Sequence, residues 1–287
     1  MLALPDLVPW VGSDRAPDIH IRLGAVPGRL GDVVHGNAFL QIAGDGTCRF
    51  EVPAVARYLI SAGRHIVVEP QPNGDAASVR LFLLGTVFAL LCHQRGVLPV
   101  HASCMAIDGK AVAFLGEAAM GKSVLAAVLA RDGHAILADD VSAVEWAADG
   151  TAMVLPGAPR LLLWRRALAD LNIASDSCPR ARAGLEKYVL SGPGHPGALS
   201  LGVVYELDVS APPSEPKPIP YATAIRNPHA SIHCTLLARH LFGARGLLDA
   251  GARFAASAPR YSLAVGRNVA QTATAAQFVI RHLATIT

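Results

Sequence analysis

The segment 116–123, Gly-Glu-Ala-Ala-Met-Gly-Lys-Ser, constrains the fold more than any other part of the chain. It matches the pattern G-x-x-x-x-G-K-S of a phosphate-binding P-loop. The apolar run 111–115 before it is typical of a buried strand, and the run 124–131 after it is rich in helix formers. Strand, glycine loop and helix are the context that the motif requires, which disfavours a chance match in a chain rich in alanine and glycine. We therefore expect an α/β fold with an anion bound at the start of the helix.

The loop also predicts individual nucleotide contacts. Its backbone N–H groups point at one spot and favour negative charge there. Lys122 is expected along the β- and γ-phosphates, and the Ser123 hydroxyl is expected to bind Mg²⁺. The predicted nucleotide-binding residues are Gly116, Glu117, Ala118, Ala119, Met120, Gly121, Lys122, Ser123 and Val124.

Composition excludes several classes of protein. With 287 residues, of which 52% are hydrophobic and 16% charged, the chain has ample material for a core and no signature of disorder. A net charge of +3 without a run of Lys or Arg disfavours a nucleic-acid partner. The five scattered cysteines contain no C-x-x-C pair, so they indicate reduced thiols in a cytoplasmic protein, not a zinc site or disulfides.

The sequence predicts no membrane segment. Met1 leads into Leu-Ala-Leu-Pro-Asp without the basic start and apolar core of a signal peptide. The longest apolar stretch, 81–92, is too short to span a bilayer, and we expect it to be a buried helix.

Patterning divides the chain into two parts. Residues 1–75 are expected to form a small α+β module, with short strands such as 19–23, 39–42 and 64–69 and a short helix over 52–60. Residues 76–287 are expected to form the nucleotide domain. Its predicted elements are a helix at 76–94, strands at 98–106, 111–115, 135–138 and 199–207, and helices at 221–246 and 269–285.

Phosphoryl transfer needs acidic groups besides the loop. Asp139 and Asp140 follow the predicted strand 135–138, and neighbouring residues of an extended chain point in opposite directions. One carboxylate is therefore expected to face a metal ion and the other an acceptor; the alternative is a polar cap on a strand end. His101 follows a neighbouring strand and is a third candidate, with a packing role as the alternative.

These residues resemble the catalytic core of the HPr kinase/phosphorylase family. His101 lies fifteen residues before Gly116, as in that family, and Gly133-His134 precedes the strand that ends in Asp-Asp. The segment Gly266-Arg267-Asn268, followed by an apolar helix, matches a third family feature. The resemblance covers 98–140 well and 264–285 loosely.

The resemblance implies a Mg-ATP-dependent serine kinase on a phosphoenolpyruvate-carboxykinase-like P-loop fold. By carry-over, Asp140 would take the proton of the acceptor hydroxyl, while Asp139 and His101 would support it and the metal. Lys122 and Ser123 would hold the phosphates and Mg²⁺. The resemblance also implies a homo-oligomer.

The chain departs from that family at several positions. Ala119 stands where the family has glycine, Val124 stands where it has an acidic residue, and the segment used for phosphorolysis is not recognisable. Over most of its length the chain is more similar to the HPr-kinase-like proteins that modify ribosomally made peptides, including the lasso-peptide tailoring kinases. The segments 22–27, 52–59, 98–103 and 159–164 carry this similarity. It implies a serine of a precursor peptide as the acceptor, which the front module could bind by strand addition.

Three basic residues are candidates for contacts with the phosphates or the acceptor: Arg160, Lys187 and Arg267. For each, a solvated surface charge is the alternative. Trp164 is expected in the core and not as an adenine platform. Two other functions stay open from the sequence, namely a small-molecule kinase on the same fold and a non-catalytic ATP-binding sensor.

Overall fold

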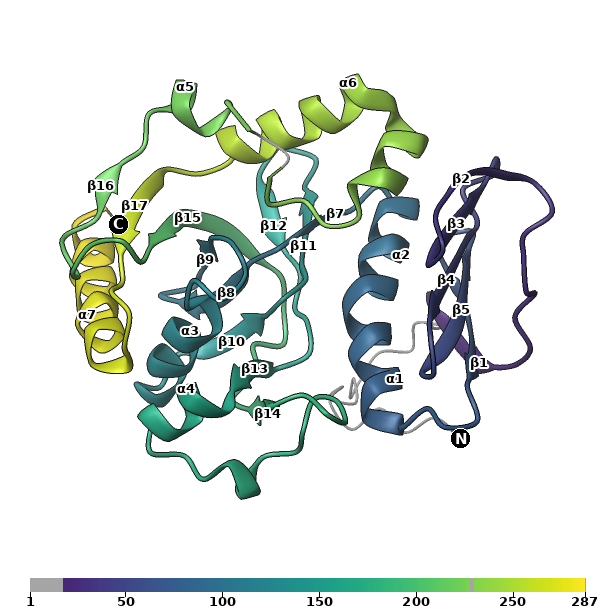
Figure 1. Cartoon of the computed structure of the whole chain (residues 1–287). Helices are drawn as coiled ribbons and strands as arrows, with labels where there is room; N and C mark the ends of the chain where they lie inside the picture. Colours follow the sequence, from purple (N-terminus) through teal and green to yellow (C-terminus); the bar gives the residue numbers. More distant parts are fainter. Residues whose placement is uncertain (1–17, 228–229, 287) are drawn as a thin grey trace.

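A computed structural model describes residues 18–227 and 230–286 of the chain. Its N-terminal part is a six-stranded sheet, called the front sheet here, with the strand order β1-β6-β5-β4-β3-β2 (Figure 1). All neighbours pair antiparallel except β1 and β6, which run parallel. The strands are β1 (His20–Leu23), β2 (Val33–Gly36), β3 (Leu40–Ala43), β4 (Cys48–Val52), β5 (Ala56–Ser61) and β6 (His65–Pro70). The strands predicted in this region are confirmed. The prediction that the chain has no signal peptide concerns residues outside the described range.

The helix predicted over 52–60 is wrong. Val52 pairs with Ala56 across a tight turn in which Ala54 has a φ of 60°, so the segment is the hairpin between β4 and β5. The side chains of Ala56, Tyr58 and Ile60 are buried, and the residues between them are half-buried. This period of two is the strand pattern, and it overrides the helix propensity of the alanines and leucine in the segment. The Tyr58 hydroxyl donates a 2.9 Å hydrogen bond to the carbonyl of Val79.

The predicted helix at 76–94 is confirmed, but it contains a π-helical turn. It comprises α1 (Ala76–Phe82), the π segment Leu83–Val87 and α2 (Phe88–Gln94). The Asp75 carboxylate caps its start by accepting a 2.8 Å hydrogen bond from the Ser78 N–H. Among the described residues, this is the one helix whose length and apolar composition would suffice to cross a membrane, and half of the window that qualifies is buried inside the fold. Residues such as Val79, Leu83 and Leu90 share a core with the front sheet.

The second sheet carries the P-loop. Its nine strands include the path β10-β8-β9-β15-β12-β11-β7, with β17 pairing β15 and β16. They are β7 (Leu98–Val100), β8 (Ser103–Ile107), β9 (Lys110–Leu115), β10 (Ala135–Ala138), β11 (Ser142–Trp146), β12 (Ala152–Val154), β15 (Leu199–Asp208), β16 (Lys217–Pro218) and β17 (Arg260–Ala264). The chain is thus a mixed α/β protein with several sheets, and the predicted α/β class is confirmed in that form.

Strand directions place several carboxyl ends at one edge of this sheet. Strand β8 runs antiparallel to both β9 and β10, so these two strands point the same way. Strands β15 and β17 run parallel to β9 and to each other. The segments that follow Leu115, Ala138, Asp208 and Ala264 therefore leave from a common edge, which is where ligands bind in sheets of this kind.

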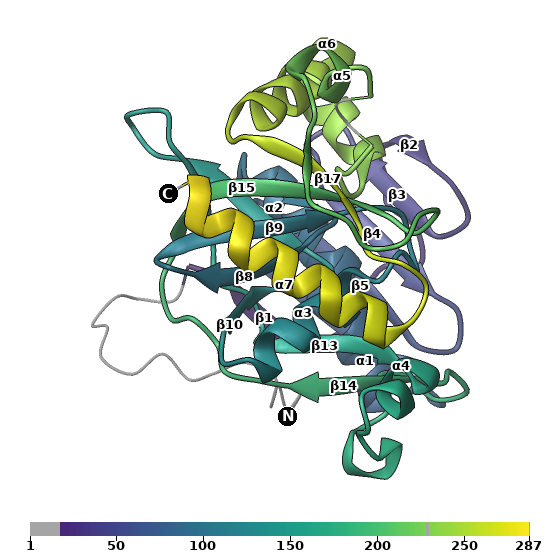
Figure 2. The same cartoon turned by 90° about the vertical axis from the view of Figure 1, so that its left-hand side faces the viewer.

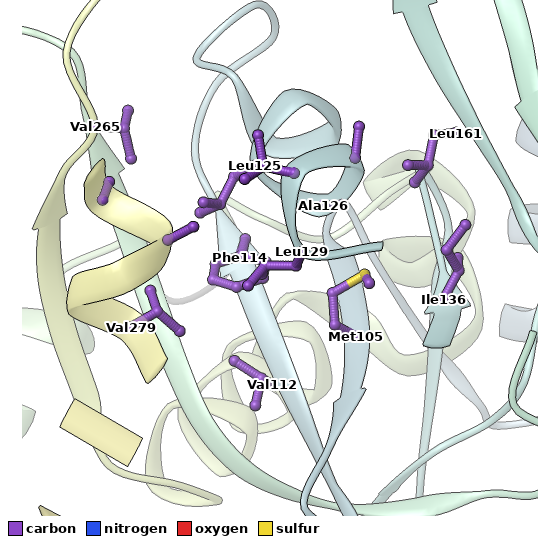
Figure 3. Close-up of a cluster of buried hydrophobic side chains, with 14 of the residues drawn as sticks. Met105, Val112, Phe114, Leu125, Ala126, Leu129, Ile136, Leu161, Val265 and Val279 are labelled. Atoms are coloured by element: carbon purple, nitrogen blue, oxygen red, sulfur yellow. The ribbon is translucent and has the colours of Figure 1, made fainter. Parts of the chain in front are cut away.

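Helices cover both faces of the second sheet. On one face lie α3 (Lys122–Arg131) and α7 (Val269–Ile286), and Figure 2 shows α7 crossing this face. Between them and the strands lies the larger core, in which Leu125 and Leu129 of α3 meet Phe114 and Met105 of the sheet (Figure 3). The opposite face packs on α6 (Thr235–Ala256), through residues such as Phe254.

Two predicted elements are divided in the structure. The predicted strand 98–106 breaks at His101 and Ala102, giving β7 and β8. The predicted helix 221–246 is wrong as one element: α5 (Tyr221–Ala224) is short, and α6 begins only at Thr235. The segment between them runs along β7, because the His101 N–H donates to the Ser231 carbonyl at 2.6 Å and the His233 N–H donates to the Pro99 carbonyl at 2.9 Å. Backbone groups bonded in this way cannot close helical turns.

The remaining elements lie beside α3. A two-stranded sheet, β13 (Arg160–Trp164) and β14 (Lys187–Ser191), pairs antiparallel. The helix α4 (Arg165–Asp170) follows β13, and a 3₁₀ turn occupies Ser175–Ser177. Figure 1 shows the helix α1–α2 standing between the front sheet and the rest of the fold.

Candidate active site

The P-loop closes around its own lysine. Lys122 begins α3 and is buried, and its ammonium group donates hydrogen bonds to the carbonyls of Gly116 at 2.7 Å and Glu117 at 3.0 Å. Gly116 has a φ of 152° and Gly121 a φ of 88°, conformations that glycine adopts at little cost. Burial is the main reason that the pKa of Lys122 lies below its usual value. The loop thus presents a cation and the start of an α-helix at one place, as phosphate binding requires.

Ala119 occupies a strained position in this loop. Its φ is 68°, in the left-handed region where a Cβ is unfavourable. The sequence departs from the usual glycine here, and the structure nevertheless retains the backbone bend. The strain is therefore present in the folded protein.

Ser123 and Asp139 form the inner half of the site. The Ser123 hydroxyl contacts both carboxylate oxygens of Asp139, at 3.0 and 3.1 Å. The other donors to this carboxylate are the Ser103 hydroxyl and the backbone N–H of Leu162, the latter at 3.1 Å. These donors are neutral, and burial raises the pKa of Asp139 above its usual value. A hydroxyl and a carboxylate beside a P-loop are the hard oxygen ligands that Mg²⁺ prefers, so this pair fits that ion.

Asp140 forms the outer half of the site. Its φ of 70° turns the chain just after Asp139, and its side chain is 37% exposed, whereas Asp139 is half-buried. The two carboxylates therefore have separate surroundings, as the alternation of an extended chain suggested. A left-handed Asp at a strand end is the kind of backbone strain that concentrates at functional sites.

Two histidines lie beside Asp140. The Nδ1 atom of His101 is 3.6 Å from the Asp140 carboxylate and 3.0 Å from Nε2 of His233. Both ring nitrogens also approach the Asp140 carbonyl oxygen, at 3.2 Å for His101 and 2.9 Å for His233. Burial, together with Lys122 and His233, lowers the pKa of His101, so its ring is neutral near pH 7.

No sequence pattern indicates that His233 lies in this site. It belongs to no motif and lies far from Asp140 in the chain, and the segment that carries it was predicted to be helical. The backbone pairing with β7 brings it next to His101. His93 of α2 fixes its backbone further, since the His93 ring donates a 2.6 Å hydrogen bond to the His233 carbonyl.

Three side chains of this half could hold a metal ion. One ligand atom each from His101, Asp140 and His233 lies within 4.8 Å of the other two. Two imidazoles and a carboxylate suit a transition metal such as Zn²⁺ or Mn²⁺, in contrast to the oxygen pair at Ser123 and Asp139.

The predicted basic residues lie at different places. Lys187 begins β14, and its charge contributes to the lowered pKa of Lys122, so it lies near the P-loop. Arg160 begins β13, is buried and borders the same cavity as Asp139 and Asp140. Arg267 follows β17 at the common sheet edge, is exposed, and donates to the Val209 carbonyl at 3.3 Å.

The expectation that Trp164 lies in the core is wrong. It ends β13 with 47% of its surface exposed, and the ammonium of Lys187 lies 5.9 Å from its ring centroid. Trp164 pairs with Lys187 across β13 and β14, which places both at the outer end of the two-stranded sheet.

The chain is similar to known proteins in structure but not in sequence. No family model and no curated protein matches the chain. Among solved structures, the chain is similar to the Hpr(Ser) kinase/phosphatase from Coxiella burnetii, with 14% sequence identity and a TM-score of 0.36, over 65% of this chain and 97% of that chain. This likeness is too distant to assign an activity, and the predicted family rests on the sequence motifs.

Proposed function

We propose that the chain is a kinase that transfers the γ-phosphoryl group of Mg-ATP to a serine hydroxyl of a peptide. The observation that carries this proposal is the difference in surroundings between two adjacent carboxylates. Asp139 is half-buried and bonded to the P-loop serine, while the Asp140 side chain is 37% exposed and lies beside His101. A nucleotide sensor needs a carboxylate beside the P-loop serine but does not need a second, exposed carboxylate.

Lys122, Ser123 and Asp139 would hold the nucleotide and its metal ion. When bound, Mg-ATP supplies the transferable phosphoryl group and a divalent charge that offsets the phosphates. The same charge would favour the ionised form of Asp139, whose burial otherwise opposes it. Lys187 and Arg267 are the proposed additional cations at this edge.

Asp140 is the proposed general base. Its carboxylate would accept the proton of the serine hydroxyl as the hydroxyl oxygen bonds to the γ-phosphorus, while the bond from that phosphorus to the β–γ bridging oxygen breaks and ADP leaves. His101 lies 3.6 Å from this carboxylate and would fix its orientation. His233 would in turn hold the His101 ring through the 3.0 Å contact between the two rings. A peptide acceptor is supported by the front sheet, whose edge strands β1 and β2 offer backbone groups for strand addition.

Mass spectrometry of a serine-ended precursor peptide tests this proposal. The peptide is incubated with the protein, ATP and Mg²⁺, alongside the Asp140→Asn variant. Asparagine tolerates the left-handed backbone of position 140, so the fold is expected to be retained. Transfer is expected to fall about 10²–10⁴-fold, the usual value of general base catalysis. The exposed Asp132→Asn variant serves as the control and should transfer normally.

The outcomes separate the alternatives. A phosphate on serine with the wild type and the control, but not with Asp140→Asn, supports the peptide kinase. Full transfer by Asp140→Asn would assign the base to another residue. ATP binding without phosphorylation of any peptide would favour a small-molecule kinase or a nucleotide sensor.

A further inference from the structure

A cavity of about 960 Å³ opens beside the outer half of the site. Asp139 and Asp140 border it, together with the start of β13 and the segment that follows β12. Its opposite wall is the helix α1–α2, through Leu84, Phe88 and Cys92. The cavity therefore lies between the element that packs on the front sheet and the proposed base.

The π-helical turn explains how the helix approaches Asp140 so closely. Gly85 lies in the middle of that turn, and a Cβ atom placed there would be 3.5 Å from a carboxylate oxygen of Asp140. Single π turns are frequent at functional sites, because they redirect side chains within a helix. Here the turn places a glycine opposite the carboxylate and the neighbouring Leu84 in the wall of the cavity.

The lining is mainly apolar near the base. Leu84 and Phe88 face the cavity from the helix, and Leu155, Pro156 and Leu162 face it from the other side. Leu84 is half-buried and belongs to none of the hydrophobic cores formed by the described residues, so its side chain is available to a ligand. An apolar wall next to a proton acceptor selects ligands whose hydroxyl sits beside an apolar group.

We propose that this cavity is the acceptor pocket and that it binds an apolar side chain next to the serine that is phosphorylated. The proposal rests on the proposed function and adds the substrate class: a peptide with a bulky apolar residue flanking its acceptor serine. The volume lies at the upper end of the range of about 300–1,000 Å³ for small-molecule sites, which suits several residues of a peptide better than a small alcohol. An acidic flanking residue would lose its hydration there and would meet the carboxylates of Asp18, Asp139 and Asp140, against Arg160 as the one lysine or arginine among the described lining residues.

Leu84 is the residue that tests the pocket. Peptides of the form X-Ser-X, embedded in one constant sequence, vary only in X, which is Ala, Leu, Trp or Asp. The wild type is expected to prefer Leu over Asp by at least tenfold in kcat/KM. Leu84→Trp should fill the cavity and reduce kcat/KM for the Leu and Trp peptides by about 10–200-fold, the range found when an apolar pocket changes by a methylene or more. Leu84→Ala should shift the preference toward Trp.

Leu248 provides the matched control. It is a leucine of α6 with 47% of its surface exposed, and it does not line the cavity. Leu248→Trp should leave the ranking of the four peptides unchanged. Thermal denaturation of all variants checks that they are folded.

Binding and transfer are measured separately, so that the two proposals can fail independently. Calorimetric titration with the same peptides reports the pocket without chemistry. Transfer to all peptides with no ranking, or a ranking that Leu84→Trp leaves intact, overturns the pocket and leaves the kinase. Leu84-dependent binding without transfer overturns the kinase and leaves the pocket. Neither binding nor transfer overturns both.

Discussion

Asp139 gives the most direct test of the site, because stability and activity should change in opposite directions. Its carboxylate is half-buried and accepts hydrogen bonds from neutral groups, including the Ser103 and Ser123 hydroxyls and the Leu162 N–H. We expect Asp139→Asn to stabilise the metal-free protein at neutral pH, because it removes a buried charge and keeps the shape of the side chain.

The hydrogen bonds allow this exchange. The amide oxygen of asparagine can accept from the Leu162 N–H, and its NH₂ group can donate to the Ser103 oxygen, since a hydroxyl both donates and accepts. The Leu162 N–H and the Ser103 hydroxyl thus each keep one hydrogen-bond partner. The expected gain is on the order of 1 kcal/mol, which corresponds to about 2–4 °C in Tm for a large domain.

Asp139→Ala is the contrasting variant. It removes the acceptor and leaves the Leu162 N–H and the Ser103 hydroxyl without a partner, each at a cost of about 1–3 kcal/mol. We therefore expect a loss of about 2–6 kcal/mol, opposite in sign to the effect of asparagine.

The pH dependence follows from the raised pKa of Asp139. Below the unfolded value of about 3.9, the carboxyl is protonated in both states and has no effect on stability. As pH rises toward and through the higher folded value, the unfolded chain ionises first and the fold loses stability. The advantage of Asp139→Asn over the wild type should therefore grow from about pH 4 upward and then level off.

Denaturant titrations with and without Mg-ATP measure both effects. At a nucleotide concentration of about 100 Kd the wild type should gain about 2.7 kcal/mol, and the asparagine variant should lose the Mg²⁺-dependent part of that gain. An asparagine variant that is less stable than the wild type in the absence of metal would refute the view that the desolvation of Asp139 outweighs its attraction to Lys122.

Three further predictions concern backbone strain, pH and the histidine pair. Ala119→Gly should raise the stability of the metal-free protein by up to about 1 kcal/mol in urea titrations, because glycine relieves the left-handed strain; no gain would mean that the loop is relaxed as it stands. Burial lowers the pKa of His93, so the unfolded chain takes up a proton first and stability should fall as pH drops below about 6.5. His93→Gln should flatten that slope in melting curves. An unchanged slope would contradict the assignment of this pH dependence to His93. His233→Phe should reduce kcat about tenfold or more, measured in single-turnover assays, with ATP affinity unchanged. A loss of ATP binding together with kcat would indicate a purely structural role for His233.

Sequence patterns predicted the strands at the P-loop edge of the second sheet because their signals are local. The P-loop, the strand before it and the Asp139-Asp140 pair lie within a short stretch, and each is fixed by neighbours in the sequence. The strands β9 and β10 form as predicted and bring these residues to one edge. Their catalytic roles remain predictions.

The outer half of the site depends on contacts that no local pattern records. His233 reaches His101 only because its segment pairs with β7, and the surrounding residues have no strand pattern of their own. The π turn at Gly85 likewise lies next to Asp140, a contact between residues far apart in the sequence. The hairpin at 52–60 was missed because a buried period of two overrides helix propensity, which is visible only when the partner strands are known.

The parallel pairing of β9 with β15, and of β15 with β17, also sets the order in which the protein can assemble. Front-sheet neighbours such as β4, β5 and β6 are hairpin partners and can associate as soon as they leave the ribosome. The P-loop strand β9 forms a hairpin with β8, but its other edge must wait, since Phe114 pairs with Tyr205, and Tyr205 pairs in turn with Tyr261 near the end of the chain. Long-range parallel pairing is slow. A ligand of the P-loop therefore cannot act as an early template for folding. Until β15 is made, the unpaired edge of β9 is the surface that a nascent chain must protect from aggregation.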